Sequence, residues 1–359
     1  MFNISKRLYQ LLVLAVLFFG LSACGGSSGK VAVLMPELET AHWREESAML
    51  ETYLVEKGYE VIRLDATNDA VLQSDQVDNM VREGVRAIII VPVDGNALVG
   101  AVERAIGENV KVIAYDRLVK TPKLSAYLSF DNREAGRLQA QAVIDMLDIE
   151  SRPAFERQAR LVRISGGPEN HNNVLYQLGQ GDALASYRQV RFVVDEVITA
   201  RDQITAQRLM ESILAEEQNI EAVLISSELL TLGVLQAFRE TGLGDDILVS
   251  AQESPASISN RIASGDVAFS IFRDRRDLPP LTVRTLDSLI KEQPLLDLER
   301  CSMADLTGDP DQEGTIFCVL LPVQLLTGES LFDLVVRSGY QPYDAVYREI
   351  PESLRPVRP

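Results

Sequence analysis

The sequence predicts an α/β protein of two lobes, each built on a doubly wound parallel β-sheet, with a ligand cleft between them. Short apolar runs of strand length alternate with stretches of helical periodicity, which is the pattern of a parallel sheet covered by helices. This alternation occurs twice, with a break near residues 129–133 and no linker rich in proline, glycine or serine. At 359 residues, the chain is long enough for two domains.

The first series of elements starts with KVAVLM at Lys30–Met35, an apolar run of strand length. The run RAIIIVP at residues 86–92 is rich in β-branched residues and is typical of a strand buried on both faces. Apolar residues at helical spacing fill residues 45–58, which end at Gly58, a favoured helix stop. In order, we expect strands at 30–35, 59–64, 86–92 and 111–115, and helices at 45–58, 71–84 and 97–108.

The second series repeats the same alternation and ends in a less regular tail. After the strand expected at 126–130, which precedes the break, we expect strands at 160–164, 190–197, 222–226, 247–250 and 267–272, and helices at 133–147, 173–187, 205–216, 230–242 and 257–263. In the tail we expect a helix at 279–291, an exposed irregular acidic segment at 297–314, one strand at 317–326, and one or two helical turns at 330–338.

The amino-terminal residues have the features of a secretion signal. Lys6 and Arg7 precede a short apolar run, which ends in small residues before Cys24. Leu-Ser-Ala-Cys at this point resembles the bacterial lipobox, which implies a signal peptide at 1–23 and a lipid on Cys24. An ordinary signal peptide cleaved elsewhere is the alternative. Residues 24–29, rich in glycine and serine, would form a flexible tether.

Composition narrows the possible partners. The chain has 35 basic and 52 acidic residues and a net charge of −17. This balance disfavours nucleic acid and anionic membranes as partners through a general electrostatic field. Gly166-Gly167 lacks the flanking pattern of a phosphate-binding loop, so we expect no nucleotide and no other cofactor.

Two cysteines remain once Cys24 is assigned to the lipid. Outside the cytoplasm disulfides persist, so we expect a Cys301–Cys318 bridge, with two buried free thiols as the alternative. A metal site is disfavoured because His42 and His171 are distant in sequence from both cysteines.

Polar side chains follow two neighbouring predicted strands. Asp116 and Arg117 come directly after Lys111–Tyr115, and Asp131 and Asn132 follow the next strand. Ligands of open parallel sheets bind beyond the carboxyl ends of the strands, so these four residues predict a site for a polar, uncharged ligand. In the structural alternatives, Asp116 and Arg117 form a hinge ion pair, and Asp131 caps the following helix.

Several motifs together resemble periplasmic sugar-binding proteins of ABC transporters, and most closely the xylose-binding members. They are KVAVLMPELETAHW from Lys30, YDR at 115–117, SFDN at 129–132 followed by AGRLQAQ, and SGGPENHNN at 165–173. The resemblance implies a type I periplasmic-binding fold with three hinge crossings, near 129–132, 272–274 and 321–322. It also implies an N-terminal lobe of residues 30–131 plus about 273–320, and a C-terminal lobe of 132–272 plus about 321–359.

The resemblance also implies which residues contact the ligand. At matching positions stand Trp43, Asp116, Arg117, Asp131, Asn132 and Asn173, with Asn172 as the alternative to Asn173. Where the family pattern differs, this chain has His42, Glu228, Glu253 and Arg273, and a second tryptophan near residues 196–201 is absent. Trp43 could instead be a packing residue, and His42 could lie at the cleft rim.

These residue types suit a sugar. Hydroxyl groups both donate and accept, so a sugar site needs carboxylates, guanidinium or amide donors, and an apolar face such as the ring of Trp43. We therefore expect a monomeric, lipid-anchored binding protein that delivers a monosaccharide to an ABC permease. A sensory protein reporting to a membrane receptor or kinase is the alternative. An enzyme is disfavoured because no nucleophile and base occur together.

Overall fold

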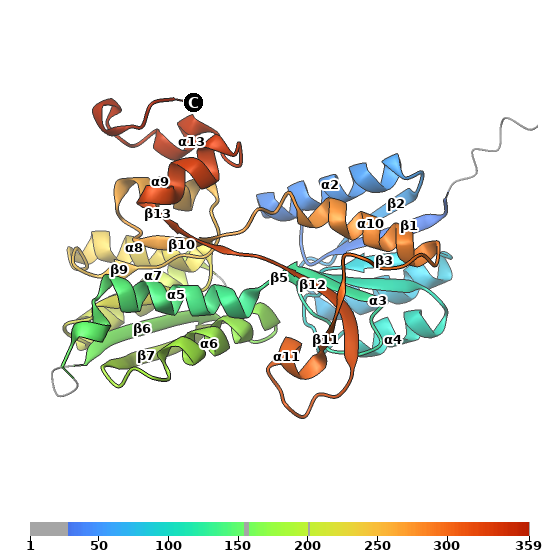
Figure 1. The fold of residues 1–359 in the computed structure, drawn as a ribbon, viewed down its shortest axis with the longest axis horizontal. Coiled ribbons are helices and arrows are strands. Elements are labelled where there is room, and N and C mark those ends of the chain that lie inside the picture. Colours follow the sequence, from blue (N-terminus) through green and yellow to red (C-terminus); the bar gives the residue numbers. More distant parts are fainter. Residues whose placement is uncertain (1–27, 154–157, 200–201, 359) are drawn as a thin grey trace, which may run out of the picture.

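The computed structural model describes residues 28–153, 158–199 and 202–358, which form two α/β lobes side by side (Figure 1). The expected signal peptide at 1–23 and Cys24 lie outside the described residues, as does most of the tether. Among the helices that the structure describes, none is both long and apolar enough to span a membrane.

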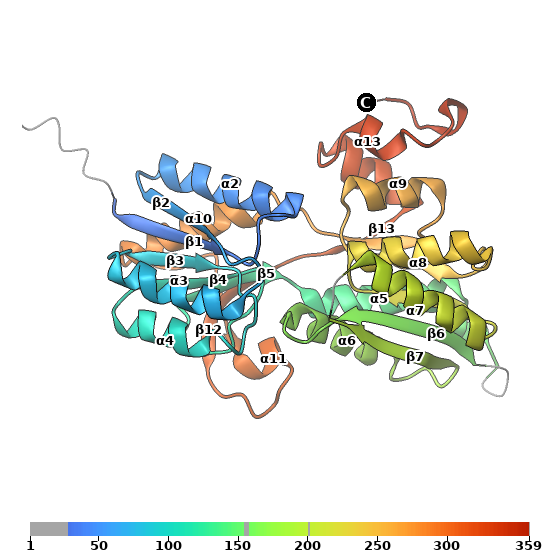
Figure 2. The same cartoon turned by 180° about the vertical axis from the view of Figure 1, so that it is seen from behind.

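The first lobe contains a seven-stranded sheet that is parallel except for one edge strand, β11. Alternate residues of β1 enter opposite cores: Val31 and Val33 pack with α2 and α10, and Ala32 and Leu34 pack with α3 and α4. Helices therefore cover both faces, as Figures 1 and 2 show. The strand order is β11 (Glu299–Ser302), β12 (Thr315–Leu321), β5 (Ala126–Phe130), β4 (Lys111–Tyr115), β3 (Ala87–Ile90), β1 (Lys30–Met35) and β2 (Glu60–Asp65). The helices are α2 (Ala41–Glu56), α3 (Ala70–Arg82), α4 (Val99–Gly107) and α10 (Leu278–Ile290).

The second lobe contains a parallel four-stranded sheet, which a bridge between Ser250 and Phe269 connects to an antiparallel pair of strands. The sheet order is β7 (Val190–Ile198), β6 (Ala159–Gly166), β8 (Ala222–Ile225) and β9 (Leu248–Val249), and the pair is β10 (Phe269–Phe272) with β13 (Gln324–Thr327). The helices are α5 (Asn132–Met146), α6 (His171–Leu184), α7 (Gln203–Glu216), α8 (Glu228–Thr241), α9 (Ala256–Ser264), α12 (Gly328–Leu331) and α13 (Tyr343–Tyr347). Short helical turns complete it: η1 (Ile149–Ser151), the π-helical η2 (Phe332–Arg337) and η3 (Glu352–Leu354).

The chain passes between the lobes after β5, after β10 and after β12 (Figure 1). The last crossing corrects an expectation, because residues 317–326 are not one strand. They are split at Pro322 into the end of β12 in the first lobe and the start of β13 in the second. Proline lacks the amide hydrogen that a continuous ladder needs, so the strand ends there.

The acidic segment 297–314 also differs from its expected irregular form. β11 pairs antiparallel with β12, and Cys301 and Cys318 on these strands are joined by a disulfide, with 5.9 Å between their Cα atoms. Helix α11 (Met303–Thr307) follows and buries Met303 and Leu306 in the first lobe. These apolar residues lie three apart among acidic neighbours, so the overall polarity of the segment concealed the helix.

Candidate functional site

Asp116 and Arg117 lie at the end of β4, both more than nine-tenths buried. Asp116 has a positive φ of 60°, an uncommon backbone conformation for a residue with a side chain. Its carbonyl oxygen accepts hydrogen bonds from the Tyr127 hydroxyl at 3.2 Å and the Ser129 hydroxyl at 2.6 Å. Two hydrogen bonds from β5 thus hold the turn that presents Asp116.

Asp131 and Asn132 lie where β5 gives way to α5. Asp131 is the N-cap, and its carboxylate accepts from the Glu134 amide at 2.9 Å. Asn132 is buried, and its Nδ2 donates to the Ser129 hydroxyl at 3.3 Å. Its Oδ1 has no hydrogen-bond partner among the described residues. The structural role considered for Asp131 is therefore present, while Asn132 keeps an acceptor available.

Asn172 and Asn173 open α6 in the second lobe and point to different partners. Nδ2 of Asn173 donates to the Gly167 carbonyl at 2.9 Å, within its own lobe. Nδ2 of Asn172 lies 3.4 Å from both the carbonyl and the Oδ2 of Asp116, across the lobe boundary. Asn172, the alternative position, is thus the asparagine next to Asp116.

His42 and Trp43 lie in the first turn of α2, which begins at Ala41 and not at the expected residue 45. Trp43 is only 3% exposed and belongs to the first-lobe core, while the guanidinium of Arg117 lies 5.4 Å from its ring centre. Trp43 is therefore a packing residue of the first-lobe core and also lies beside the charged side chains of Arg117 and Arg275. Burial, together with the charge of Arg275, lowers the pKa of His42 to about 3, so His42 is neutral at pH 7.

Glu46 and Arg275 form a buried ion pair that the sequence analysis missed. Glu46 is on α2, and Arg275 is in the crossing between β10 and α10. The hydroxyl of Tyr115 donates to the other Glu46 oxygen at 2.5 Å. Burial raises the pKa of Glu46 above its usual range, and the neighbouring Arg275 opposes that shift. The signal available in the sequence was the run RDRRD directly after a buried strand.

Glu253 and Arg273 contribute from the second lobe. Glu253 also has a positive φ, of 66°, and its Oε1 lies 2.5 Å from Arg275 and 3.5 Å from Arg273. Burial alone would raise the pKa of Glu253, but the charges of the two arginines outweigh it and lower this pKa to about 2. Arg273 donates to Gln252 at 3.0 Å and lies over the ring of Tyr176 at 5.1 Å.

Glu228, the first residue of α8, accepts a hydrogen bond from the Ser257 hydroxyl. Burial raises its pKa, and the charge of Glu253 acts in the same direction. The charge of Glu253 therefore affects the pKa of Glu228, but the hydrogen bond to the Glu228 carboxylate comes from Ser257 of the neighbouring helix α9.

Unpartnered polar atoms are concentrated in this region. Around Asp116, Glu253 and Arg273, five side-chain atoms are buried without a hydrogen-bond partner in the part of the chain that the structure describes. They are Asn132 Oδ1, Asn172 Oδ1, Gln252 Nε2, Ser254 Oγ and Arg273 Nε. Buried polar atoms are rarely left unsatisfied, so this set of two acceptors and three donors suits a ligand that offers both.

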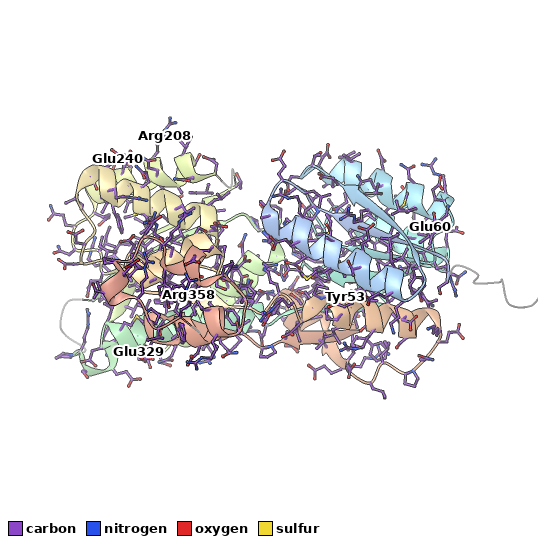
Figure 3. All side chains as sticks on the ribbon, turned by 90° about the horizontal axis from the view of Figure 1, so that it is seen from above. Tyr53, Glu60, Arg208, Glu240, Glu329 and Arg358 are labelled. Atoms are coloured by element: carbon purple, nitrogen blue, oxygen red, sulfur yellow. A yellow bond between two sulfur atoms is a disulfide. The ribbon has the colours of Figure 1, made fainter. Side chains whose placement is uncertain are left out.

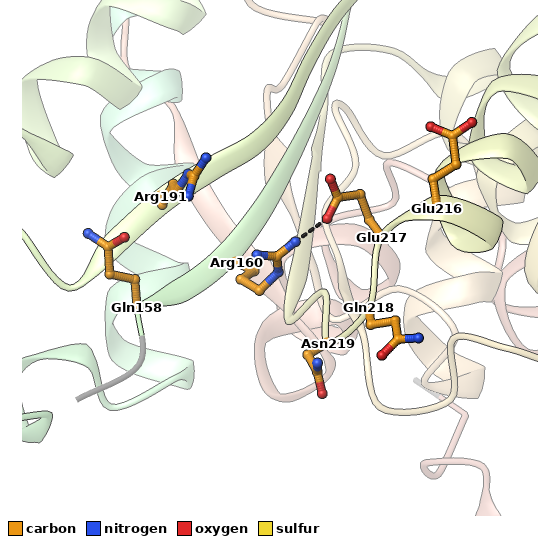
Figure 4. Close-up of a pocket in the computed structure, with 7 residues that line it drawn as sticks. All are labelled: Gln158, Arg160, Arg191, Glu216, Glu217, Gln218 and Asn219. Atoms are coloured by element: carbon orange, nitrogen blue, oxygen red, sulfur yellow. Dashed lines mark hydrogen bonds and ion pairs between the residues drawn. The ribbon is translucent and has the colours of Figure 1, made fainter.

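A hollow of about 500 Å³ lies elsewhere, at the amino ends of β6 and β7 (Figure 4). Arg160 and Glu217 form an ion pair within it. Ligands of parallel sheets bind at the opposite, carboxyl ends, so this hollow is separate from the cluster around Asp116. Glu299 lies beside Cys301 and Cys318, but the disulfide occupies both sulfurs and leaves no metal-binding thiolate.

Comparison with known proteins gives consistent results. Residues 31–294 match the model of a periplasmic binding protein domain. The chain is 27% identical over 248 residues to the D-xylose-binding periplasmic protein of Escherichia coli K12, covering 68% of this chain and 72% of that protein. It is 28% identical over 295 residues to the multiple sugar-binding periplasmic receptor of Rhizobium radiobacter, covering 77% and 82%.

A solved structure agrees with these sequence relatives. An ABC transporter solute-binding protein from Clostridium phytofermentans with bound β-D-glucose aligns with a TM-score of 0.77 and 26% identity, over 88% of this chain and 99% of that one. These relatives are binding proteins and not enzymes.

Proposed function

Because this chain belongs to the periplasmic binding protein domain family, we propose that it binds a neutral monosaccharide between its two lobes. The observation that carries this proposal is the set of five buried, unpartnered donors and acceptors around Asp116 and Arg273. A sugar hydroxyl can satisfy either type. The relatives named for xylose and for multiple sugars favour a xylose-like aldose as the ligand.

The charges of the cluster support an uncharged ligand. Glu46, Arg275, Glu253 and Arg273 alternate in sign along a continuous chain of ion pairs. A ligand with a net charge would leave one member of this chain unbalanced in a buried region, which costs free energy. The rings of Trp43 and Tyr176 lie beside the arginines and offer apolar surface for the face of a sugar ring.

Binding would act through movement of the lobes. We assign residues 30–131 and about 273–320 to one rigid unit, and 132–272 and about 321–359 to the other. A sugar contacting both units stabilises the closed arrangement, which a partner then recognises. We further assign a lipid anchor to Cys24, a monomeric state, and an ABC permease as the partner that receives the sugar.

Titration calorimetry would test the proposal on the soluble form that begins after Cys24. Xylose, ribose, arabinose, glucose and galactose would be compared with non-sugar metabolites. Saturable binding to a sugar is expected, and the double variant Asp116→Ala with Arg117→Ala should abolish it. The matched control removes the exposed pair Asp78 and Arg104 of the same lobe. Unchanged affinity in the Asp116/Arg117 variant contradicts the assigned site.

A sensory role is the second candidate, supported by the word "receptor" in the name of the Rhizobium radiobacter relative. The same closure would then report a sugar to a membrane receptor or kinase. The genes beside this one discriminate the two roles, since a permease and an ATPase favour import and a kinase favours sensing.

A further inference from the structure

Arg275 occupies the second of the three lobe crossings, between the end of β10 in the second lobe and the start of α10 in the first. Its side chain is 9% exposed. Such a position lets one guanidinium group reach carboxylates from both lobes, because it lies between them in the chain as well as in space.

On the first-lobe side, Arg275 pairs with Glu46 of α2. Glu46 is itself fixed by the Tyr115 hydroxyl, and α2 and α10 pack together in one core. Since Arg275 comes just before α10, the pair with Glu46 would be retained when the second lobe moves.

On the other side, Arg275 Nη2 lies 2.5 Å from Glu253 Oε1. Glu253 belongs to the second lobe, in the turn after β9, and shares its carboxylate with Arg273. Opening the lobes would separate Arg275 from Glu253, because their remaining anchors lie in different units.

We propose that the Arg275–Glu253 ion pair is a clasp between the lobes, which favours the closed arrangement before a sugar arrives. The inference rests on the proposed function, because it concerns how the same cleft opens and closes. The side chain of Arg275 is 9% exposed and that of Glu253 is 29% exposed, so water screens their attraction only in part, and loss of this attraction opposes opening. A larger closed population also raises the apparent affinity, since a ligand then selects a state that is already common.

Interlobe distances measured by electron spin resonance would test the clasp. Spin labels at Glu60→Cys and Arg208→Cys report on opposite lobes, as Figure 3 shows. The full chain with Cys24→Ser, kept oxidised at Cys301–Cys318 and purified in detergent, would be measured without ligand and with saturating xylose.

The variants are Arg275→Met, Glu253→Gln and Arg275→Lys. Arg104→Met is the control, because Arg104 pairs with Asp78 inside one lobe.

Without ligand, we expect a predominant short distance in the parent and in Arg104→Met. In Arg275→Met and Glu253→Gln the ratio of closed to open molecules should fall by about tenfold, a change of about 1.4 kcal/mol. Arg275→Lys should recover part of the closed population. A parent that is mainly open, or variants with the parent distribution, would overturn the clasp. If Arg275→Met does not fold, Glu253→Gln still decides, since it leaves the Arg275–Glu46 pair in place.

The xylose samples separate this inference from the proposed function. If the variants open and xylose restores the short distance, both proposals are supported. If the variants open but neither xylose nor any other sugar of the panel binds to the parent, the clasp stands and the sugar assignment fails.

Discussion

At the residue scale, Asp116 and Glu253 share an unusual backbone conformation. Each follows a parallel strand, one in each lobe, and has φ near +60°, although neither is glycine. This conformation costs on the order of 1 kcal/mol and persists where surrounding contacts enforce it. In both cases the turn directs a carboxylate toward the arginines of the crossing or the asparagine of the facing lobe. The strain is therefore located where the two lobes meet.

Asn172 and Asn173 give a residue-scale prediction, because they are adjacent but have different partners. Asn172→Ala should weaken sugar binding by at least about tenfold, since it removes a polar group facing Asp116, with little change in melting temperature. Asn173→Ala should instead destabilise the second lobe by about 1–2 kcal/mol, because it leaves the Gly167 carbonyl without its buried donor. Calorimetry and thermal unfolding of both variants check this. The reverse pattern would assign the site to Asn173.

Some of these residues could be predicted from the sequence, and the reason is physical. Asp116 and Arg117 are the first two residues after one apolar strand, and Asp131 and Asn132 are the first two after the next, so the ends of these strands could be used to predict them. Glu46 and Arg275 were missed because charged residues on a helix face or in a loop usually face solvent. Glu46 and Arg275 become buried only because α2 packs against the segment between β10 and α10 in the folded chain.

At the element scale, the bounds of the buried strands of the first lobe were easier to predict than the first residue of α2 or the bounds of the strands in the tail. The predicted bounds of β1, β4 and β5 matched the observed ones, because strands buried on both faces form nearly continuous apolar runs, in which Ser129 of β5 is the one internal polar residue. Helix α2 begins four residues early, since its first turn buries Trp43 while its other residues look polar. The division of residues 317–326 depends on which sheet each half joins, and this is a long-range property.

The packing of α5 against α6 gives an element-scale prediction. Gly136 of α5 lies against the Tyr176 carbonyl, and Gly179 of α6 lies against the Arg133 carbonyl, with no room for a methyl group at either glycine. Gly179→Ala should therefore lower the free energy of unfolding by about 1–3 kcal/mol. Gly181→Ala, on the same helix with open space around it, should be neutral or stabilising by up to about 1 kcal/mol. Denaturant unfolding measures both, and equal effects would contradict the close packing.

The β11–β12 hairpin gives a second element-scale prediction. Its disulfide joins residues 17 apart in sequence. The double variant Cys301→Ser with Cys318→Ser should lose about 3 kcal/mol of stability, because the unfolded chain gains freedom. Thermal unfolding with and without a reductant measures the loss. Reductant should lower the stability of the parent and leave the variant unchanged, and a parent that is insensitive to reductant would contradict the prediction.

At the scale of the whole molecule, two further links join the lobes, in addition to the contact between Asn172 and Asp116. Arg275 links them through the crossing segment, and His171 links them through α11. Nε2 of His171, on the second lobe, lies 3.0 Å from the Leu306 carbonyl on the first. The Cys301–Cys318 disulfide holds the hairpin from which α11 extends. The first lobe thus reaches the second through a segment that is itself cross-linked.

This second link predicts a specific response to acid. Burial, aided by the charge of Lys120, lowers the pKa of His171 from 6.5 to about 4. The unfolded chain therefore binds a proton at His171 at higher pH than the folded chain, and stability falls as pH decreases from about 6.5 to about 4. Well inside that window the loss from this group approaches about 1.4 kcal/mol per pH unit. In the folded state the added proton would sit on Nδ1, which is buried without a partner among the residues described.

His171→Gln tests this response, because glutamine can donate to the Leu306 carbonyl but cannot titrate. Denaturant unfolding at pH 7.5, 6.0 and 5.0 should give similar stabilities for parent and variant at pH 7.5, and a shallower decline for the variant below pH 6.5. Burial and the charge of Arg275 also lower the pKa of His42, so the variant should keep part of the decline. His42→Gln should remove that remaining part when combined with His171→Gln. If His171→Gln declines as steeply as the parent, the buried neutral histidine is not the origin of the response, and the link through α11 would be insensitive to acid.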